Sequence, residues 1–186
     1  MMKLVVKNMV CPRCIAAVEQ VMKDNDAAPL YVNLGEVVLP AALSPEKLKK
    51  IKADLEHLGF ELLDDARKQQ IEKIKSIIIK HIHHDGDQKF IFSEIISKAL
   101  KRDYSQLSKL FSETEGVTIE QYVILQKVEK VKELLVYGEM NINEIAMELG
   151  YSSSAHLSAQ FKKVTGLTPS QFKNQGIGLR KTLDKV

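Results

Sequence analysis

The chain lacks the features that mark secreted and membrane-spanning proteins. Only two cysteines occur among its 186 residues, and no stretch is long and apolar enough to cross a bilayer. The apolar run from Met1 to Val10 is short and interrupted by Lys3 and Lys7, so it does not resemble a signal peptide. We therefore expect a soluble, cytoplasmic protein that has no membrane partner.

Other absences narrow the class of protein further. No low-complexity tract and no internal repeat is visible, which argues against disorder and against a solenoid. The chain offers no nucleophile motif and no phosphate-binding loop, so we expect no enzyme. Its composition is that of an ordinary globular protein, with 45% hydrophobic and 27% charged residues. That length and that composition suit one or two domains with hydrophobic cores.

The charge is distributed unevenly along the chain. The formal net charge is +3, but acidic side chains outnumber basic ones in residues 1–66, and basic ones are in excess from residue 67 onward. The balance changes where the sequence pattern changes, which indicates two domains. A mildly basic second domain is compatible with nucleic-acid binding but does not establish it.

The first domain, residues 1–65, shows a mixed pattern of short strands and amphipathic helices. Apolar residues at helical spacing follow the first predicted strand, and Ser44 with Pro45 marks the start of a second helix, which Gly59 ends. The strands are predicted at Lys3–Lys7, Leu30–Val32, Glu36–Leu39 and Phe60–Leu63. The order β-α-β-β-α-β predicts a small ferredoxin-like domain.

Cys11 and Cys14 are three positions apart at the expected start of the first helix, so both sulfurs can face one ion. The helix dipole and the nearby Arg13 favour thiolates over thiols. Thiolates select soft or borderline ions such as Cu(I) and Zn(II), but zinc prefers four ligands. We therefore favour Cu(I) or a similar soft ion as the cofactor, and we expect Met9 to anchor the loop in the core.

The Met-x-Cys-x-x-Cys motif at Met9–Cys14, together with the stretches Leu34–Leu39 and Leu58–Phe60, resembles the heavy-metal-associated domain of copper chaperones and metal-pumping ATPases. The resemblance covers residues 2–65 and implies metal binding at Cys11 and Cys14. Asn8 departs from the family, which usually has Gly there. Two other interpretations stay open, namely a dithiol redox site and an inactive motif in a dimerisation or effector domain.

The second domain, residues 66–178, is predicted to be all helical. An apolar stripe marks a helix over Gln69–His84, in which we interpret the histidines as polar residues of the last turn, suited to the helix dipole, and not as a metal cluster. Two short helices joined by a tight turn then occur twice, and a long helix bridges the pairs. The expected caps and stops are Asp103, Gly116, Thr118, Gly138, Asn141, Gly150, Ser152 or Ser153, Gly166 and Thr168-Pro169.

The stretch INEIAMELGYSSSAHLSAQFKKVTGLTPSQFK, from Ile142 to Lys173, resembles the AraC-family DNA-binding domain. Leu107–Val123 matches the first recognition helix of that family, and the resemblance covers about residues 70–176. It implies a sequence-specific transcription regulator. The departures lie mainly in the first half: Lys101 replaces the usual Gly of the turn, Arg102 replaces an apolar residue, and Gln126–Val128 replaces a basic Arg-Leu pair.

The fold class is therefore α+β, with a ferredoxin-like domain, a tandem helix-turn-helix domain and a tail at residues 179–186. A recognition helix enters the major groove and reads base edges through outward polar side chains, where Gln can pair with adenine and Lys with guanine. The candidates for base contacts are Ser105, Gln106, Ser108, Lys109, Ser153, Ser154, His156, Ser158 and Gln160. The candidates for phosphate contacts are Lys101, Arg102, Lys162, Lys163 and Lys173.

Taken singly, each of these lysines is more often a solvated surface charge. The hypothesis of DNA binding therefore depends on the positions of all the candidates together. The favoured function is a regulator that binds double-stranded DNA and responds to a soft metal ion at Cys11 and Cys14. The alternative is a metal-trafficking protein with a helical partner-binding domain. The further partners expected are a second copy of the chain and a metal-donor protein.

Overall fold

The computed structural model describes residues 1–85, 91–175 and 181–186. It contains two compact units, Met1–Ile77 and Ile78–Val186. The sequence places the domain boundary at residue 65, at the start of helix α3 (Ala66–Ile79), whereas the compact units divide near the end of that helix.

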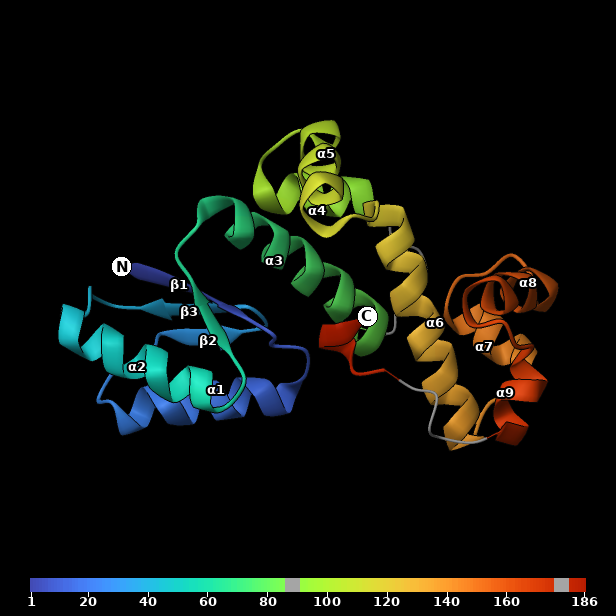
Figure 1. The fold of residues 1–186 in the computed structure, drawn as a ribbon, viewed down its shortest axis with the longest axis horizontal. Coiled ribbons are helices and arrows are strands. Elements are labelled where there is room, and N and C mark those ends of the chain that lie inside the picture. The colour runs from blue at the N-terminus through green and yellow to red at the C-terminus, as the bar shows by residue number, and fades with distance from the viewer. Residues whose placement is uncertain (86–90, 176–180) are drawn as a thin grey trace. The chain divides into compact units, whose positions relative to one another are not determined.

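The first unit is built on a four-stranded sheet. Its elements are β1 (Met2–Lys7), α1 (Pro12–Asp24), β2 (Tyr31–Asn33), β3 (Glu36–Leu39), α2 (Pro45–His57) and β4 (Glu61–Leu63). The strand order is β2-β3-β1-β4, and each neighbouring pair is antiparallel. Helices α1 and α2 lie on the same side of the sheet (Figure 1). The predicted order of strands and helices is therefore confirmed.

The core of this unit follows from the two periodicities of its sequence. Alternate residues of β1, Leu4 and Val6, are buried, and they pack with the apolar stripe of α1 and with Ile51 and Leu55 of α2. The turn between β2 and β3 requires glycine, because Gly35 has φ +76° and a Cβ there would collide with the Ser76 hydroxyl. Met9 is 1% exposed and lies in this core, as the sequence predicts.

The second unit is helical. After a π-helical turn at Lys80–His84 it contains α4 (Phe92–Leu100), α5 (Tyr104–Glu115), α6 (Ile119–Tyr137), α7 (Ile142–Glu148), α8 (Ser154–Thr165) and α9 (Pro169–Gln175), followed by a short 3₁₀ turn at Leu183–Lys185. Helices α4 and α5 lie at one end of α6, and α7 to α9 lie along its other half (Figure 1). The predicted pair of helix-turn-helix units bridged by a long helix is confirmed. Within the described residues, every helix is too short or too polar to cross a bilayer.

Polar side chains begin the helices of this unit where the sequence predicts. Thr118 and Gln121 form a reciprocal capping box at the start of α6, and Asn141 and Glu144 form another at the start of α7. Of the two serines proposed for α8, Ser153 is the cap, because its Oγ accepts a hydrogen bond from a backbone N–H of the first turn at 3.1 Å. Local sequence therefore fixes where these three helices, α6, α7 and α8, start.

Each helix-turn-helix unit has an aromatic pair in its core. The rings of Phe111 and Tyr122 are 5.5 Å apart in the first, and those of Phe161 and Phe172 are 5.6 Å apart, edge to face, in the second. In the second helix-turn-helix, Phe161 is 1% exposed and belongs to a cluster with Leu157 and the apolar face of α6. The first pair joins α5 to α6 and the second joins α8 to α9, while the cluster around Phe161 packs α8 and α9 on the long helix.

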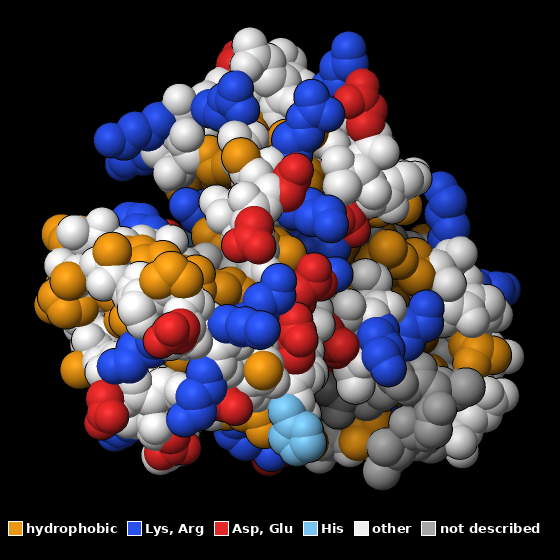
Figure 2. Space-filling view, turned by 60° about the vertical axis from the view of Figure 1, so that its left-hand side comes forward, with side chains coloured by type: hydrophobic (Ala, Val, Ile, Leu, Met, Phe, Trp, Pro, Cys, Tyr) orange, Lys and Arg blue, Asp and Glu red, His pale blue; other side chains and the backbone are white. Residues whose placement is uncertain are grey.

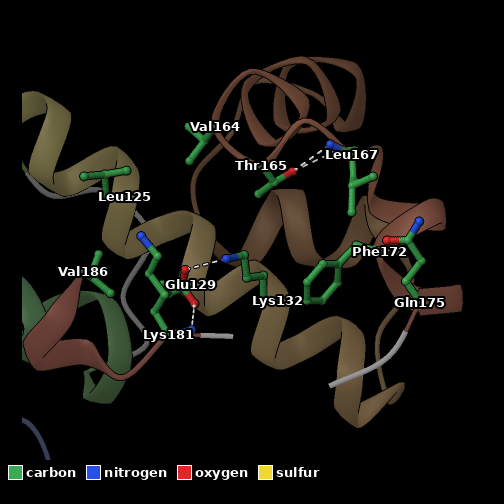
Figure 3. A pocket seen from close by; sticks show the side chains of 10 residues that line it. All are labelled: Leu125, Glu129, Lys132, Val164, Thr165, Leu167, Phe172, Gln175, Lys181 and Val186. Carbon is green, nitrogen blue, oxygen red and sulfur yellow. Dashed lines mark hydrogen bonds and ion pairs between the residues drawn. The ribbon is translucent and has the colours of Figure 1, made fainter. Parts of the chain in front are cut away.

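A buried ion pair lies on α6 beside a cavity of about 520 Å³ (Figure 3). Lys132 Nζ is 2.6 Å from Glu129 Oε1, and the two residues are 7% and 5% exposed. The C-terminal segment completes the arrangement, because the backbone N–H of Lys181 donates to Glu129 Oε2 at 3.1 Å. Both carboxylate oxygens of Glu129 are thus hydrogen-bonded inside the unit.

Two residues at which the sequence departs from a glycine of the resembled families have left-handed backbone. Asn8 has φ 72° and Lys101 has φ 52°. Asparagine tolerates this conformation, and the Asn8 side chain donates a hydrogen bond to the carbonyl of Gly59 at 2.9 Å. Lysine has no such compensation, so the α4–α5 turn holds a strained backbone at Lys101.

We expect Lys101→Gly to raise the free energy of unfolding by about 0.5–1 kcal/mol. The left-handed conformation costs an L-residue roughly 1–2 kcal/mol, and glycine avoids this cost. Glycine also loses more conformational entropy on folding, which destabilises the folded state by about 0.5–1 kcal/mol and leaves the net gain stated above. Urea denaturation measures the difference. Lys98→Gly, a few residues earlier within α4, is the control and should instead destabilise by about 1 kcal/mol. Equal destabilisation by both substitutions would contradict the assignment of strain.

Candidate nucleic-acid interface

The first candidate recognition helix is α5, which follows the turn at Lys101–Asp103. Ser105, Gln106 and Lys109 are exposed on it, whereas Ser108 is half-buried. The Asp103 carboxylate caps the helix by accepting from the backbone N–H groups of Ser105 (2.8 Å) and Gln106 (3.4 Å). The Ser105 hydroxyl also donates to this carboxylate, and these bonds lower the pKa of Asp103. Ser105 can therefore offer a base only acceptor lone pairs.

Lys109 has a partner on the same helix that the sequence interpretation missed. Its Nζ is 3.9 Å from a carboxylate oxygen of Glu113, four residues on, and both side chains are largely exposed. An exposed pair at this distance contributes little free energy, so Lys109 can exchange it for a phosphate or a guanine. The i,i+4 spacing of opposite charges was the available signal for this pair.

The second candidate recognition helix, α8, exposes a different set of side chains. Its cap Ser153 and His156 are exposed, whereas Ser154, Ser158 and Gln160 are half-buried. Two residues that were not among the candidates, Ala155 and Ala159, are exposed instead. Their four-residue spacing, on the face opposite Leu157 and Phe161, could have identified them from the sequence. The prediction considered only polar side chains and therefore did not include them.

Tyr151, in the turn before α8, holds two of the candidate side chains. Its hydroxyl donates to Gln160 Oε1 at 2.7 Å, and its ring contacts that of His156 edge to face at 5.5 Å. His156 Nδ1 is also 3.1 Å from the hydroxyl of Ser152. Burial raises the pKa of Tyr151 to about 12, so it is a neutral donor at physiological pH. The turn therefore orients His156 and Gln160 before any ligand arrives.

The residues that replace the family's basic pair in α6 have structural partners. Lys127 donates to the carbonyl of Leu149 at 2.8 Å and lies 5.3 Å from the centre of the Tyr151 ring. Burial lowers the pKa of this lysine. Lys127 thus joins the linker helix to the second helix-turn-helix turn and is not an exposed phosphate ligand.

The neighbouring Gln126 is fully buried and joins three segments of the unit. Its amide donates to the Tyr122 hydroxyl (3.0 Å) and the Leu183 carbonyl (3.3 Å), while its Oε1 is 3.0 Å from His83 Nε2. Burial lowers the pKa of His83 to about 4, so this imidazole is neutral. The interpretation of His83 as a cation suited to the helix dipole is therefore wrong, because its ring is buried against α6.

The candidate phosphate ligands are all at the surface. Lys101, Arg102, Lys162, Lys163 and Lys173 are exposed. Lys and Arg side chains are spread over the upper part of the molecule around α4 and α5, where acidic side chains interrupt them (Figure 2). Such a mixed surface gives moderate electrostatic attraction to a polyanion, which suits phosphate contacts that position a protein on a duplex.

In the first unit, Cys11 is the cap residue of α1 and Cys14 lies in its first turn, and both are free thiols. Their sulfurs are 3.5 Å apart. Burial raises the pKa of Cys11, but hydrogen bonds from Cys14 and the charge of Arg13 outweigh it and leave that pKa lowered; burial raises the pKa of Cys14. No group of three or more metal-ligating side chains occurs among the described residues. The donor set therefore fits a two-coordinate soft ion better than zinc.

Comparison with known proteins concerns the second unit. Residues 96–175 match the family described as Helix-turn-helix domain. An uncharacterized HTH-type transcriptional regulator of Bacillus subtilis, YtdP, is 29% identical over 106 residues, which is 57% of this chain but only 14% of that protein. The chain thus spans a small part of this relative's length.

Two solved structures share the fold. The C-terminal domain of AraT, a response regulator from Geobacillus stearothermophilus, superposes with a TM-score of 0.52 at 25% identity, over 61% of this chain and 90% of that one. A Chromobacterium violaceum regulator described as having an AraC-type DNA-binding domain superposes with the same score at 19% identity, over 58% and 92% of the two chains. The second unit therefore shares its fold with these two proteins.

Proposed function

We propose that this chain, whose residues 96–175 are a helix-turn-helix domain of the AraC type, is a transcription regulator that recognises double-stranded DNA by sequence. The observation that carries the proposal is the pair of capped recognition helices, α5 and α8, attached to one long helix. Each exposes the beginning of its helix, with Ser105 and Gln106 on α5 and with Ser153 and His156 on α8. The first turns of a recognition helix are the part that reaches base edges in the major groove.

Different residues supply position and specificity in this proposal. Lys162 and Lys163, in the last turns of α8, contact phosphates and set the orientation of the helix on the duplex. Gln106 and Lys109 on α5 hydrogen-bond to base edges, since both have long polar side chains on the exposed face. The aromatic pairs in the two cores hold α5 and α8 rigidly on α6, so little ordering is needed on binding.

Selection of oligonucleotides by the purified chain tests this function, and binding at several salt concentrations then separates the two kinds of contact. The double variant Lys162→Ala/Lys163→Ala should weaken binding to all sequences and reduce the salt slope by about one for each phosphate that a lysine no longer neutralises. Lys49→Ala/Lys50→Ala, which removes the same charge from exposed positions of α2, is the matched control. Failure to select any sequence, or equal effects of the two double variants, would contradict the proposal.

A second activity, binding of a soft metal ion by Cys11 and Cys14, is favoured by the 3.5 Å separation of the two sulfurs. We interpret the βαββαβ unit as ferredoxin-like and as a heavy-metal-associated domain. The departure at Asn8 does not oppose this, because Asn8 keeps the left-handed backbone that glycine would adopt there. Cys11, whose pKa is lowered, supplies the first thiolate, and the bound ion alters the affinity for DNA.

Anaerobic titration with Cu(I) in competition with a chelator tests the metal site, and DNA binding with and without Cu(I) tests the coupling. Cys11→Ser/Cys14→Ser should abolish tight Cu(I) binding and any effect of Cu(I) on DNA affinity. If the double variant responds to Cu(I) as the native chain does, regulation through this pair is wrong. Transfer of Cu(I) to another thiol protein without sequence-selective DNA binding would favour a trafficking function.

A further inference from the structure

The outer face of α8 presents two methyl groups. Ala155 and Ala159 are exposed and are separated by four residues, so they lie one above the other on the same face. Counted from the cap of each helix, the α5 residues at the same two positions are polar and exposed, Ser105 and Lys109. The two recognition helices therefore offer different chemistry to a base.

The long polar side chains of α8 that flank this face are held from the turn before the helix. Tyr151 donates to Gln160 Oε1 at 2.7 Å, and its ring packs against that of His156. The His156 Nδ1 is in turn 3.1 Å from the hydroxyl of Ser152. These contacts orient both side chains from the turn, and the two alanine methyl groups are exposed beside His156, which also stays exposed.

Small side chains also let this helix approach a surface closely. Positions 152–155 hold three serines and Ala155, so none of these four residues places a long side chain between the start of α8 and a groove floor. A methyl group cannot exchange hydrogen bonds with a base edge. Of the four bases, only thymine presents an apolar group in the major groove, its 5-methyl, and alanine is a residue that contacts it.

We infer that Ala155 and Ala159 read thymine 5-methyl groups in the major groove, so that α8 selects thymine by apolar contact while α5 reads by hydrogen bonds. The inference rests on the proposed function, sequence-selective binding of double-stranded DNA. It assigns specificity to two residues whose side chains form no hydrogen bond, and it makes Tyr151 a positioning residue that holds the Gln160 amide beside this face.

Replacement of thymine by uracil in a selected binding site tests the inference, because uracil keeps every hydrogen-bonding group and lacks only the methyl. Each thymine in the half-site read by α8 is replaced singly, and the ratio of dissociation constants is measured with the full chain. Removal of a methyl that an alanine touches should weaken binding by about fourfold, the equivalent of burying one methyl-sized group. Thymines in the half-site read by α5 should give a ratio near one.

Variants of the two alanines assign the effect to residues. Ala155→Gly and Ala159→Gly should each bring the thymine-to-uracil ratio at one position close to one, and Gln106→Ala on α5 should leave both ratios unchanged. A ratio compares two DNAs with the same protein, so it does not depend on how much glycine weakens the helix. Ala159→Ser, which keeps a side chain on the helix, should lower the same ratio.

The outcomes separate the inference from the function on which it rests. A selected site that binds equally well with thymine and with uracil throughout overturns the inference and leaves the DNA-binding function intact. Methyl discrimination that survives both glycine variants also overturns it. If the chain selects no sequence at all, both the proposed function and the inference fail.

Discussion

Lys132→Met should lower the free energy of unfolding of the second unit by about 3–5 kcal/mol, because it leaves the Glu129 carboxylate buried without its cation. Glu129 is 5% exposed, and its Oε1 is 2.6 Å from the Lys132 ammonium. The backbone N–H of Lys181 at Oε2 cannot by itself compensate for a buried negative charge. Urea denaturation followed by circular dichroism measures the loss.

A second substitution should restore most of that stability. In Glu129→Gln/Lys132→Met no charge is buried, and the glutamine oxygen can still accept the hydrogen bond from Lys181. Replacement of a whole buried pair is often close to neutral, whereas removal of one partner is not. The double variant should therefore be more stable than Lys132→Met alone, and additive losses in the two single variants and the double one would contradict this account.

The same helix provides a matched control. Lys130 and Glu133 have the same three-residue spacing and lie 2.7 Å apart, but their side chains are 18% and 20% exposed. Water reaches this pair, so Lys130→Met should destabilise by about 1 kcal/mol or less. A loss as large as that of Lys132→Met would show that burial is not the cause of the difference.

Local signals in the sequence were sufficient to place the elements of the fold. Asp103, Thr118 and Asn141 cap helices in the structure because each accepts hydrogen bonds from N–H groups within three residues, an interaction that local sequence determines. Spacing of apolar residues likewise predicted α4 at Phe92–Leu100 with the bounds observed. Interactions of this kind do not depend on the rest of the fold.

Contacts between distant segments are what the sequence could not provide. His83 was interpreted from its place at a helix end, but its ring is buried beside Gln126, which is 43 positions away. Tyr151 draws Gln160 to one side of the α8 surface, so a residue expected to face outward has its carbonyl engaged. The sequence thus located the two candidate helices, and tertiary packing decides which side chains they expose.

The turn at Lys101 was identified from the sequence, but its conformation could be seen only in the structure. Comparison with a family glycine position drew attention to this residue, and the structure keeps the left-handed backbone that such a glycine would adopt. The backbone N–H of Arg102 also bonds to the Ser97 carbonyl at 3.2 Å, as a helix of this kind requires at its end. The way α4 ends therefore sets this backbone conformation, and any residue with a Cβ at this position is strained by it.

The other large effect is expected from Phe161→Ala, which should destabilise the second helix-turn-helix unit by about 3–5 kcal/mol. The Phe161 ring is 1% exposed and packs edge to face on Phe172, so its removal leaves a cavity between α8 and α9 that backbone cannot fill. Val164→Ala, on the same helix but 38% exposed, should change stability by about 0.5 kcal/mol or less.

The consequence for DNA recognition should be confined to one side of the binding site. With α8 no longer held on α6, footprinting of the Phe161→Ala variant should lose protection over the half-site read by α8, while α5, whose core contains Phe111 and Tyr122, keeps its own contacts. Because Phe161 is buried, it cannot contact DNA, so any loss arises from the position of the helix. Unchanged protection of both half-sites, in a variant shown to be destabilised, would mean that α8 binds DNA without the packing of Phe161 against α9 and α6.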